Sequence, residues 1–174
     1  KRAAGEPVMV PSFRPDKALA VDDLVAWKAY LLRLSAAADV AIDSYEDLVA
    51  ALDARHAAFH ELGCRASDHG LITPPATFAT APALKSLFAR LLAGAVPTAE
   101  ESESFKTALL LEVGRMNAKR GWAMQLHLAA LRNLNTPMFK QLGPDTGYDA
   151  ASDASIAQKL GAFMNALQSE GMLP

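Results

Sequence analysis

The feature that most constrains the fold is an alternation of short strand-like segments with long helix-like ones. The strand candidates are residues 8–13 (VMVPSF), 64–70 (CRASDHG) and 122–128 (WAMQLHL). The segments between them carry apolar residues at helical spacing together with helix start and stop signals. Strands separated in this way usually pair in parallel through helical crossovers, so the alternation predicts an α/β fold.

The helix-like segments have recognisable ends. Thr98 and Glu101 predict a capping box, and Gly121 predicts the end of the same helix. Ser44 is a natural N-cap for a second helix, which Gly63 should end. In chain order, helices are expected at residues 20–38, 44–62, 81–93, 98–120 and 155–169.

Composition excludes several classes of protein. The 174 residues are 51% hydrophobic, enough for one packed domain. A net charge of -2 argues against a nucleic-acid binder, and no apolar run approaches the roughly 20 residues needed to span a bilayer. The single cysteine, Cys64, rules out an internal disulfide and suits a reducing compartment. We therefore expect a cytoplasmic protein without nucleic-acid or membrane partners.

Three polar residues recur near the ends of the strand candidates. Arg14, Asp68 and His127 lie 54 and 59 residues apart along the chain. In (β/α) barrels the carboxyl ends of the strands carry the chemistry, because the loops that follow them converge there. Arginine suits a carboxylate or phosphate, and histidine and aspartate suit hydroxyl binding or proton transfer. The structural alternatives are a bracing arginine, a turn-capping aspartate and a core histidine.

Two further groups of polar residues are open to interpretation. Arg132 follows His127 by five residues and leads into a loop rich in asparagine, proline and glycine, residues 133–149. That loop contains neither a Walker nor a dinucleotide-binding glycine pattern. His56 and His60 have a zinc-compatible spacing but no obvious third ligand, so a plain helix face is expected.

Together these stretches resemble a known family. FRPDK, GCRASDHG, GWAMQLHLAALRN and NTPMFKQLGPDTGYD, in this order, are similar to uronate isomerase (glucuronate isomerase), a divergent member of the amidohydrolase superfamily. The resemblance implies a distorted (β/α)8 barrel that interconverts D-glucuronate with D-fructuronate, and D-galacturonate with D-tagaturonate, through an enediol-like intermediate. It places Arg14, Asp68, His127 and Arg132 on the active-site face. We assign Asp68 and His127 to catalysis and both arginines to substrate binding.

The sequence also departs from the family pattern. Family members are much longer, and they hold a divalent metal, zinc or manganese, through a His-x-His motif and a later Asp-x-Arg motif. This chain contains no His-x-His, so the resemblance implies that the metal ligands are not in it. We expect residues 1–174 to be one internal segment of the barrel domain, with about three parallel strands and helical insertions at about 20–62 and 81–120. Such a segment should be inactive alone, and its parent could be a homo-oligomer.

Two alternatives remain on the sequence alone. One is a non-enzymatic helical interaction domain, and the other is a different amidohydrolase-type hydrolase on the same scaffold. The barrel interpretation requires Arg14, Asp68 and His127 to converge on one side of adjacent parallel strands. In a helical interaction domain these residues would be scattered.

Overall fold

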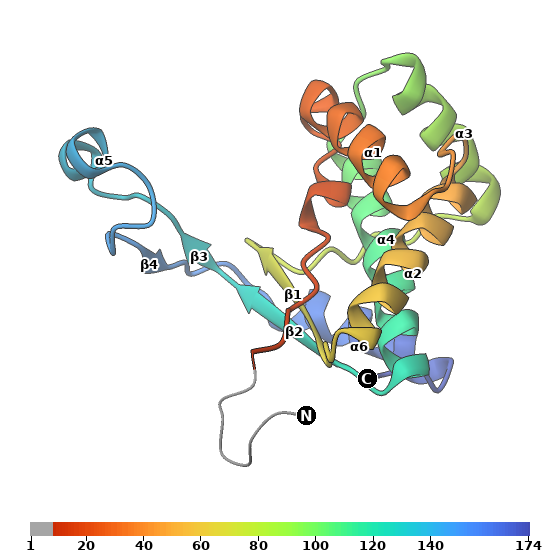
Figure 1. Cartoon of the computed structure of the whole chain (residues 1–174). Helices are drawn as coiled ribbons and strands as arrows, with labels where there is room; N and C mark the ends of the chain where they lie inside the picture. Colours follow the sequence, from red (N-terminus) through yellow and green to blue (C-terminus); the bar gives the residue numbers. More distant parts are fainter. Residues whose placement is uncertain (1–8) are drawn as a thin grey trace, which may run out of the picture.

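The structure is a computed structural model that describes residues 9–174, and it is rich in helices (Figure 1). Its elements in chain order are η1 (Asp16–Leu19), α1 (Leu24–Ala38), α2 (Tyr45–Glu61), β1 (Ala66–Leu71), α3 (Ala81–Ala93), α4 (Ala99–Arg120), β2 (Ala123–Leu128), β3 (Ala130–Leu131), α5 (Thr136–Leu142), β4 (Ala150–Ala151) and α6 (Ala157–Ser169). Within this part of the chain, no helix is both long and apolar enough to cross a membrane.

The sheet is built on a parallel pair. β1 and β2 lie side by side in register from Ala66 opposite Ala123 to Leu71 opposite Leu128. The crossover between them is formed by α3 and α4, as a parallel connection requires. The α/β prediction with parallel strands is therefore confirmed.

The first predicted strand is much shorter than expected. Among the described residues of this segment, 9–13, only Phe13 pairs with β1, in parallel and opposite Ser67. Two backbone hydrogen bonds hold it: the Phe13 N–H donates to Ala66 O at 3.1 Å, and the Asp68 N–H donates to Phe13 O at 2.9 Å. Pro11 has no N–H to donate and so interrupts pairing before this point. The start of the expected strand, at residue 8, lies outside the described residues.

The helix prediction is largely confirmed because the capping residues act as expected. Thr98 and Glu101 form the capping box of α4, and Ser44 caps α2 together with Asp47. The predicted start of α1 at residue 20 is wrong. The Asp23 side chain accepts a hydrogen bond from the Ala26 N–H, which starts the helix at residue 24.

A short arm was not predicted. Residues 129–152, called the arm below, contain the antiparallel pair β3–β4 and helix α5, and they project away from the helices (Figure 1). The sequence predicted only a shaped loop here. The Asn135 side chain accepts from the Met138 N–H and Pro137 lies in the first turn, so the turn-forming residues start a helix.

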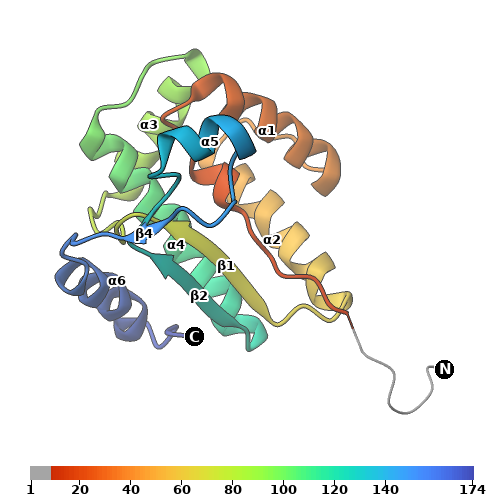
Figure 2. The ribbon, with the colours of Figure 1, turned by 90° about the vertical axis from the view of Figure 1, so that its left-hand side faces the viewer.

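The core lies between the helices and one face of the sheet, where α2 and α4 cover β1 and β2 (Figure 2). A second packed region lies among the helices, where Trp27 of α1 is fully buried and meets Phe88 of α3 and Phe105 of α4 edge-on at centroid distances of 5.7 and 5.9 Å. The Trp27 indole N–H donates to Ala18 O at 2.9 Å, so its polar atom is also satisfied. α6 packs on α4 where Gly114 faces Leu167.

Candidate active site

The two faces of β1 have different roles. Ser67 and His69 are fully buried on the face toward the helices. Because successive side chains of a strand point to opposite faces, Asp68 projects from the other face. His127 of β2 lies opposite Gly70 in the register, so its side chain shares the face of Asp68.

On that face three predicted residues meet, and we call Arg14, Asp68 and His127 the strand-end cluster. Arg14 Nη1 lies 3.3 Å from Asp68 Oδ2, and His127 Nε2 lies 2.6 Å from Asp68 Oδ1. The latter contact is close but lacks good hydrogen-bond angles, and Asp68 Oδ1 has no other partner. Arg14 and His127 are about half exposed, while the Asp68 side chain is 19% exposed. Two members can therefore reach a ligand while the carboxylate holds them together.

The position of Asp68 differs in one respect from the prediction. The sequence placed it at the carboxyl end of its strand, but β1 continues to Leu71 and Asp68 lies in its middle. Residues 69–71 remain part of β1 because they pair with residues 126–128 of β2. His127, by contrast, is the second-last residue of β2, as expected.

Asp16 in η1 supports the cluster from beside it. Its Oδ2 accepts hydrogen bonds from Arg14 Nε at 3.1 Å and from the Gly70 N–H at 2.9 Å. Its Oδ1 lies 3.1 Å from His69 Nδ1. Burial alone would raise the pKa of Asp16, but the hydrogen bonds from His69 and Gly70 outweigh it and bring this pKa below its usual value. Asp16 is therefore an ionised anchor for Arg14.

Gly70 provides the space in which Arg14 lies. A Cβ atom at position 70 would come within 2.6 Å of Arg14 Nη2, closer than any real contact allows. The guanidinium thus lies directly against the backbone of β1, and a side chain at residue 70 would displace it.

Arg132 lies apart from the cluster. It belongs to the arm, where it directly follows β3. Among the described residues, its guanidinium forms an ion pair with Asp149. The Asn133 N–H also donates to Asp149, at 2.9 Å, and together these two contacts lower the pKa of Asp149, the Asn133 bond more strongly. Three of the four predicted site residues therefore converge, and the fourth is engaged within the arm.

The described residues do not fit a metal ion. Between residues 9 and 174 no three histidine, cysteine, aspartate or glutamate side chains are grouped closely enough to hold one. His56 and His60 are engaged elsewhere: His56 Nε2 lies 2.9 Å from Asn117 Oδ1, and His60 Nδ1 accepts from the Trp122 indole at 2.9 Å. Both histidine side chains therefore form contacts within the fold.

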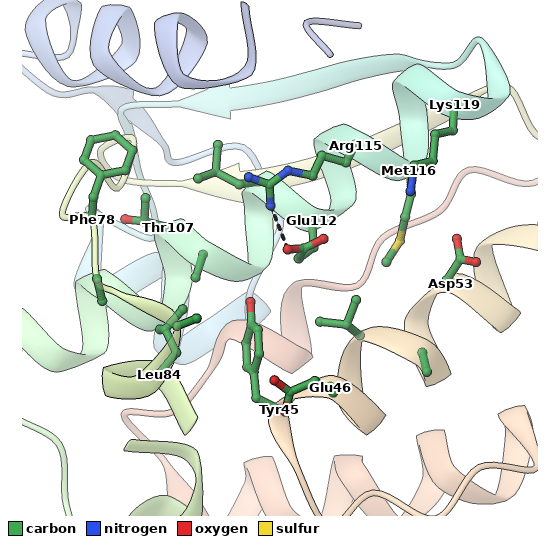
Figure 3. A pocket seen from close by; sticks show the side chains of 16 residues that line it. Tyr45, Glu46, Asp53, Phe78, Leu84, Thr107, Glu112, Arg115, Met116 and Lys119 are labelled. Carbon is green, nitrogen blue, oxygen red and sulfur yellow. Dashed lines mark hydrogen bonds and ion pairs between the residues drawn. The ribbon is translucent and has the colours of Figure 1, made fainter. Parts of the chain in front are cut away.

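One cavity lies away from the strand-end cluster. It measures about 580 Å³ and lies among α2, α3 and α4, where Figure 3 shows the ion pair of Arg115 and Glu112 beside Tyr45. A second cavity, of about 470 Å³, is lined by Asp16 and Gly70 and therefore adjoins the cluster. The chemistry of the side chains, rather than cavity size, marks the second region as the candidate site.

Sequence reasoning missed the residues that support the site. Asp16 stands in FRPDK and His69 and Gly70 stand in SDHG, so the stretches were noticed but these positions received no role. A carboxylate two residues after Arg14 was the available signal. Its contact with His69, 53 residues away, was not visible in the sequence.

The parallel pair of strands, the helical crossover between them and the polar side chains on one sheet face are the arrangement expected for a segment of a (β/α) barrel. Two solved structures are similar to this chain in fold. A uronate isomerase from Thermotoga maritima matches with a TM-score of 0.81 and 31% identity over 94% of this chain and 36% of that one. A glucuronate isomerase from Caulobacter crescentus matches with a TM-score of 0.76 and 25% identity, over 91% of this chain and 33% of that one. The chain belongs to the glucuronate isomerase family, whose model matches residues 3–174.

Curated relatives agree with this assignment. The chain is 42% identical to the uronate isomerase of Phocaeicola vulgatus and 40% identical to that of Cellvibrio japonicus, each over 165 residues. Each alignment covers 95% of this chain and 35% of the relative. The chain thus spans about a third of the length of the curated relatives it matches.

Proposed function

We propose that this chain is one segment of a longer uronate isomerase, called the parent below, and that the strand-end cluster forms one wall of its active site. The parent would interconvert D-glucuronate with D-fructuronate, and D-galacturonate with D-tagaturonate. The observation that carries the proposal is the meeting of Arg14, Asp68 and His127 on one sheet face in a member of this family. Residues 20–62 and 81–120 would be helical insertions in the barrel domain.

The geometry supports a role for each member of the cluster. Arg14 is about half exposed, and its guanidinium can bind a uronate carboxylate through two parallel hydrogen bonds. Aldose–ketose isomerisation moves a proton between adjacent carbons, which is work for a general base or acid such as an exposed histidine. Asp68, in contact with His127, would fix the orientation of the imidazole ring.

Arg132 is proposed as a second substrate-binding residue. Its pair with Asp149 uses one guanidinium nitrogen, and the side chain is 56% exposed, so further donors are available to sugar oxygens. Among the described residues it forms no ion pair or hydrogen bond with the strand-end cluster, so we propose that the substrate bridges the two.

The parent's remaining properties follow from the family resemblance. A divalent cation, zinc or manganese, would be held by residues outside the described part of this chain and would act there as a Lewis acid. A cytoplasmic location is supported by the lone buried thiol of Cys64. The net charge of -2 fits an enzyme of small sugars better than a nucleic-acid partner, and a homo-oligomeric parent is compatible with the site.

The isolated 174-residue chain should not isomerise D-glucuronate, whereas the parent should. The chain supplies one wall of the proposed site without the metal-binding residues. Conversion of D-glucuronate to D-fructuronate is followed by ¹H NMR for both proteins at equal molar concentration. Turnover by the isolated chain would contradict the proposed division of the site. Hydrolase activity in the parent without isomerisation would favour the amidohydrolase-type hydrolase instead.

Replacing Gly70 by alanine in the parent should raise the KM for D-glucuronate by about tenfold, the effect of losing about 1.4 kcal/mol of binding. The new Cβ would meet Arg14 Nη2 at 2.6 Å and push the guanidinium off its place. Thermal stability should change little, because the clashing atom ends a flexible side chain.

A matched control is Gly161→Ala in α6, where an added Cβ meets no atom within 4 Å. KM should stay at the wild-type value in this variant. An unchanged KM in Gly70→Ala as well would show that the position of the Arg14 guanidinium against β1 does not matter for substrate binding.

A further inference from the structure

A chain of hydrogen bonds, called the relay below, runs from the helix layer along the buried face of β1 to Asp16, which supports the strand-end cluster. His56 Nε2 lies 2.9 Å from Asn117 Oδ1, and Asn117 Nδ2 donates to Ser67 Oγ at 2.7 Å. Ser67 Oγ lies 2.9 Å from His69 Nε2, and His69 Nδ1 lies 3.1 Å from Asp16 Oδ1. All of these residues except Asp16 are fully buried. The relay thus joins α2, α4, β1 and η1.

The donors and acceptors fix the direction of the relay. Asp16 is ionised and can only accept, so His69 Nδ1 must carry a hydrogen. His69 Nε2 then accepts from the Ser67 hydroxyl, whose oxygen in turn accepts from the Asn117 amide. The amide oxygen of Asn117 accepts from His56 Nε2–H. Each contact of the relay then has one donor and one acceptor, with a hydrogen on Nδ1 of His69 and on Nε2 of His56, while His56 Nδ1 is left without a partner among the described residues.

The relay ends on the group that orients Arg14. Asp16 Oδ1 takes the bond from His69, which leaves Oδ2 to accept from Arg14 Nε and the Gly70 N–H. The other side of the guanidinium faces Asp68 at 3.3 Å. The network therefore leaves the core and ends at Asp16, which lines a cavity and holds the half-exposed guanidinium of Arg14.

We propose that Asp16 and His69 are positioning residues, which hold the Arg14 guanidinium in the orientation that receives the substrate carboxylate. The proposal rests on the proposed function, because it concerns the same site. Buried hydrogen bonds are strong in a low-dielectric interior, so a relay anchored at Asn117 and His56 fixes His69 rigidly. His69 then fixes Oδ1 of Asp16, so that Oδ2 stays in place to accept from Arg14 Nε and the Gly70 N–H.

The first test is the tautomer of His69. The 174-residue chain is labelled with [¹⁵N]histidine, and its four histidines are examined at neutral pH by ¹H–¹⁵N correlation through the imidazole ring. His69, identified by the signals lost in His69→Asn, should carry its hydrogen on Nδ1, and His56 on Nε2. A hydrogen on Nε2 of His69 would overturn the proposal, since Asp16 would then have no donor there.

The second test, made in the parent, asks whether His69 positions Asp16 or only fills space in the core. His69→Asn places an amide N–H where Nδ1–H lies and can still donate to Asp16. His69→Gln places its amide near Nε2 and keeps only the contact with Ser67. The KM for D-glucuronate should rise about tenfold in His69→Gln with kcat changed by less than about threefold, while His69→Asn stays within about threefold of the wild-type KM.

The outcomes distinguish the two proposals. If filling the core were the only task of His69, the larger glutamine would serve at least as well as asparagine, and equal or reversed KM values would overturn the inference. A parent that does not isomerise any uronate would refute the proposed function. In that case the tautomer measurement would still decide whether the relay exists.

Discussion

Replacing Asp68 by asparagine in the parent should lower kcat for D-glucuronate by about 10²- to 10⁴-fold, the usual contribution of a group that takes part in proton transfer. Asp68 contacts both other members of the cluster, Arg14 at 3.3 Å and His127 at 2.6 Å. An amide keeps the size of the side chain but removes the charge that pairs with the guanidinium and orients the imidazole. Initial rates over a range of D-glucuronate concentrations, followed by ¹H NMR, give kcat and KM separately.

The control for this variant is Asp53→Asn. Asp53 lies on α2 and pairs with Arg120 at a partly exposed position, and among the described residues it contacts no member of the strand-end cluster. It should leave kcat unchanged. A wild-type kcat in Asp68→Asn as well would reduce Asp68 to a structural partner of Arg14 and remove it from the catalytic assignment.

Replacing Trp27 by alanine should destabilise the chain by about 3–5 kcal/mol. Trp27 is fully buried, packs edge-on against Phe88 and Phe105, and donates to Ala18 O. Alanine would leave a large cavity and an unpaired buried carbonyl oxygen. A domain is usually stable by about 5–15 kcal/mol, so this loss is a large part of the free energy of unfolding. The midpoint of urea unfolding, measured by circular dichroism, should therefore fall strongly.

Val25→Ala is a suitable comparison on the same helix. Val25 is 84% exposed, so its truncation should change the free energy of unfolding by less than about 0.5 kcal/mol. Equal effects of the two substitutions would mean that α1 does not pack on the core through Trp27.

The sequence was most informative where local chemistry determines structure. Helix ends depend on residues three or four positions apart, so Thr98 and Ser44 predicted the starts of α4 and α2. Strand length depends on a partner that the sequence does not show. Phe13 pairs at a single position because Pro11 limits the segment before it, and the turn residues around Asn135 were wrongly expected to form a loop.

The same distinction applies to the candidate site. Strand-end logic was enough to predict the meeting of Arg14, Asp68 and His127, because parallel strands bring the loops after them together. Arg132 was assigned chiefly by resemblance, and its role stays a prediction. The hydrogen bond between Asp16 and His69 joins positions 53 residues apart. It depends on how η1 packs against β1, and no local sequence pattern predicts that packing.

The single pairing position of Phe13 has a thermodynamic consequence for the site. Asp68 and His127 belong to a six-residue ladder, whereas the described residues before and including Arg14, 9–14, are held to the sheet by two backbone hydrogen bonds. Segments with few such bonds open at a lower free-energy cost than the ladder beside them. Of the three cluster residues, Arg14 thus lies on the segment that should open locally at the lowest free-energy cost. Part of the carboxylate's binding energy would be used to order that segment, so the affinity of the site depends on local stability as well as on direct contacts.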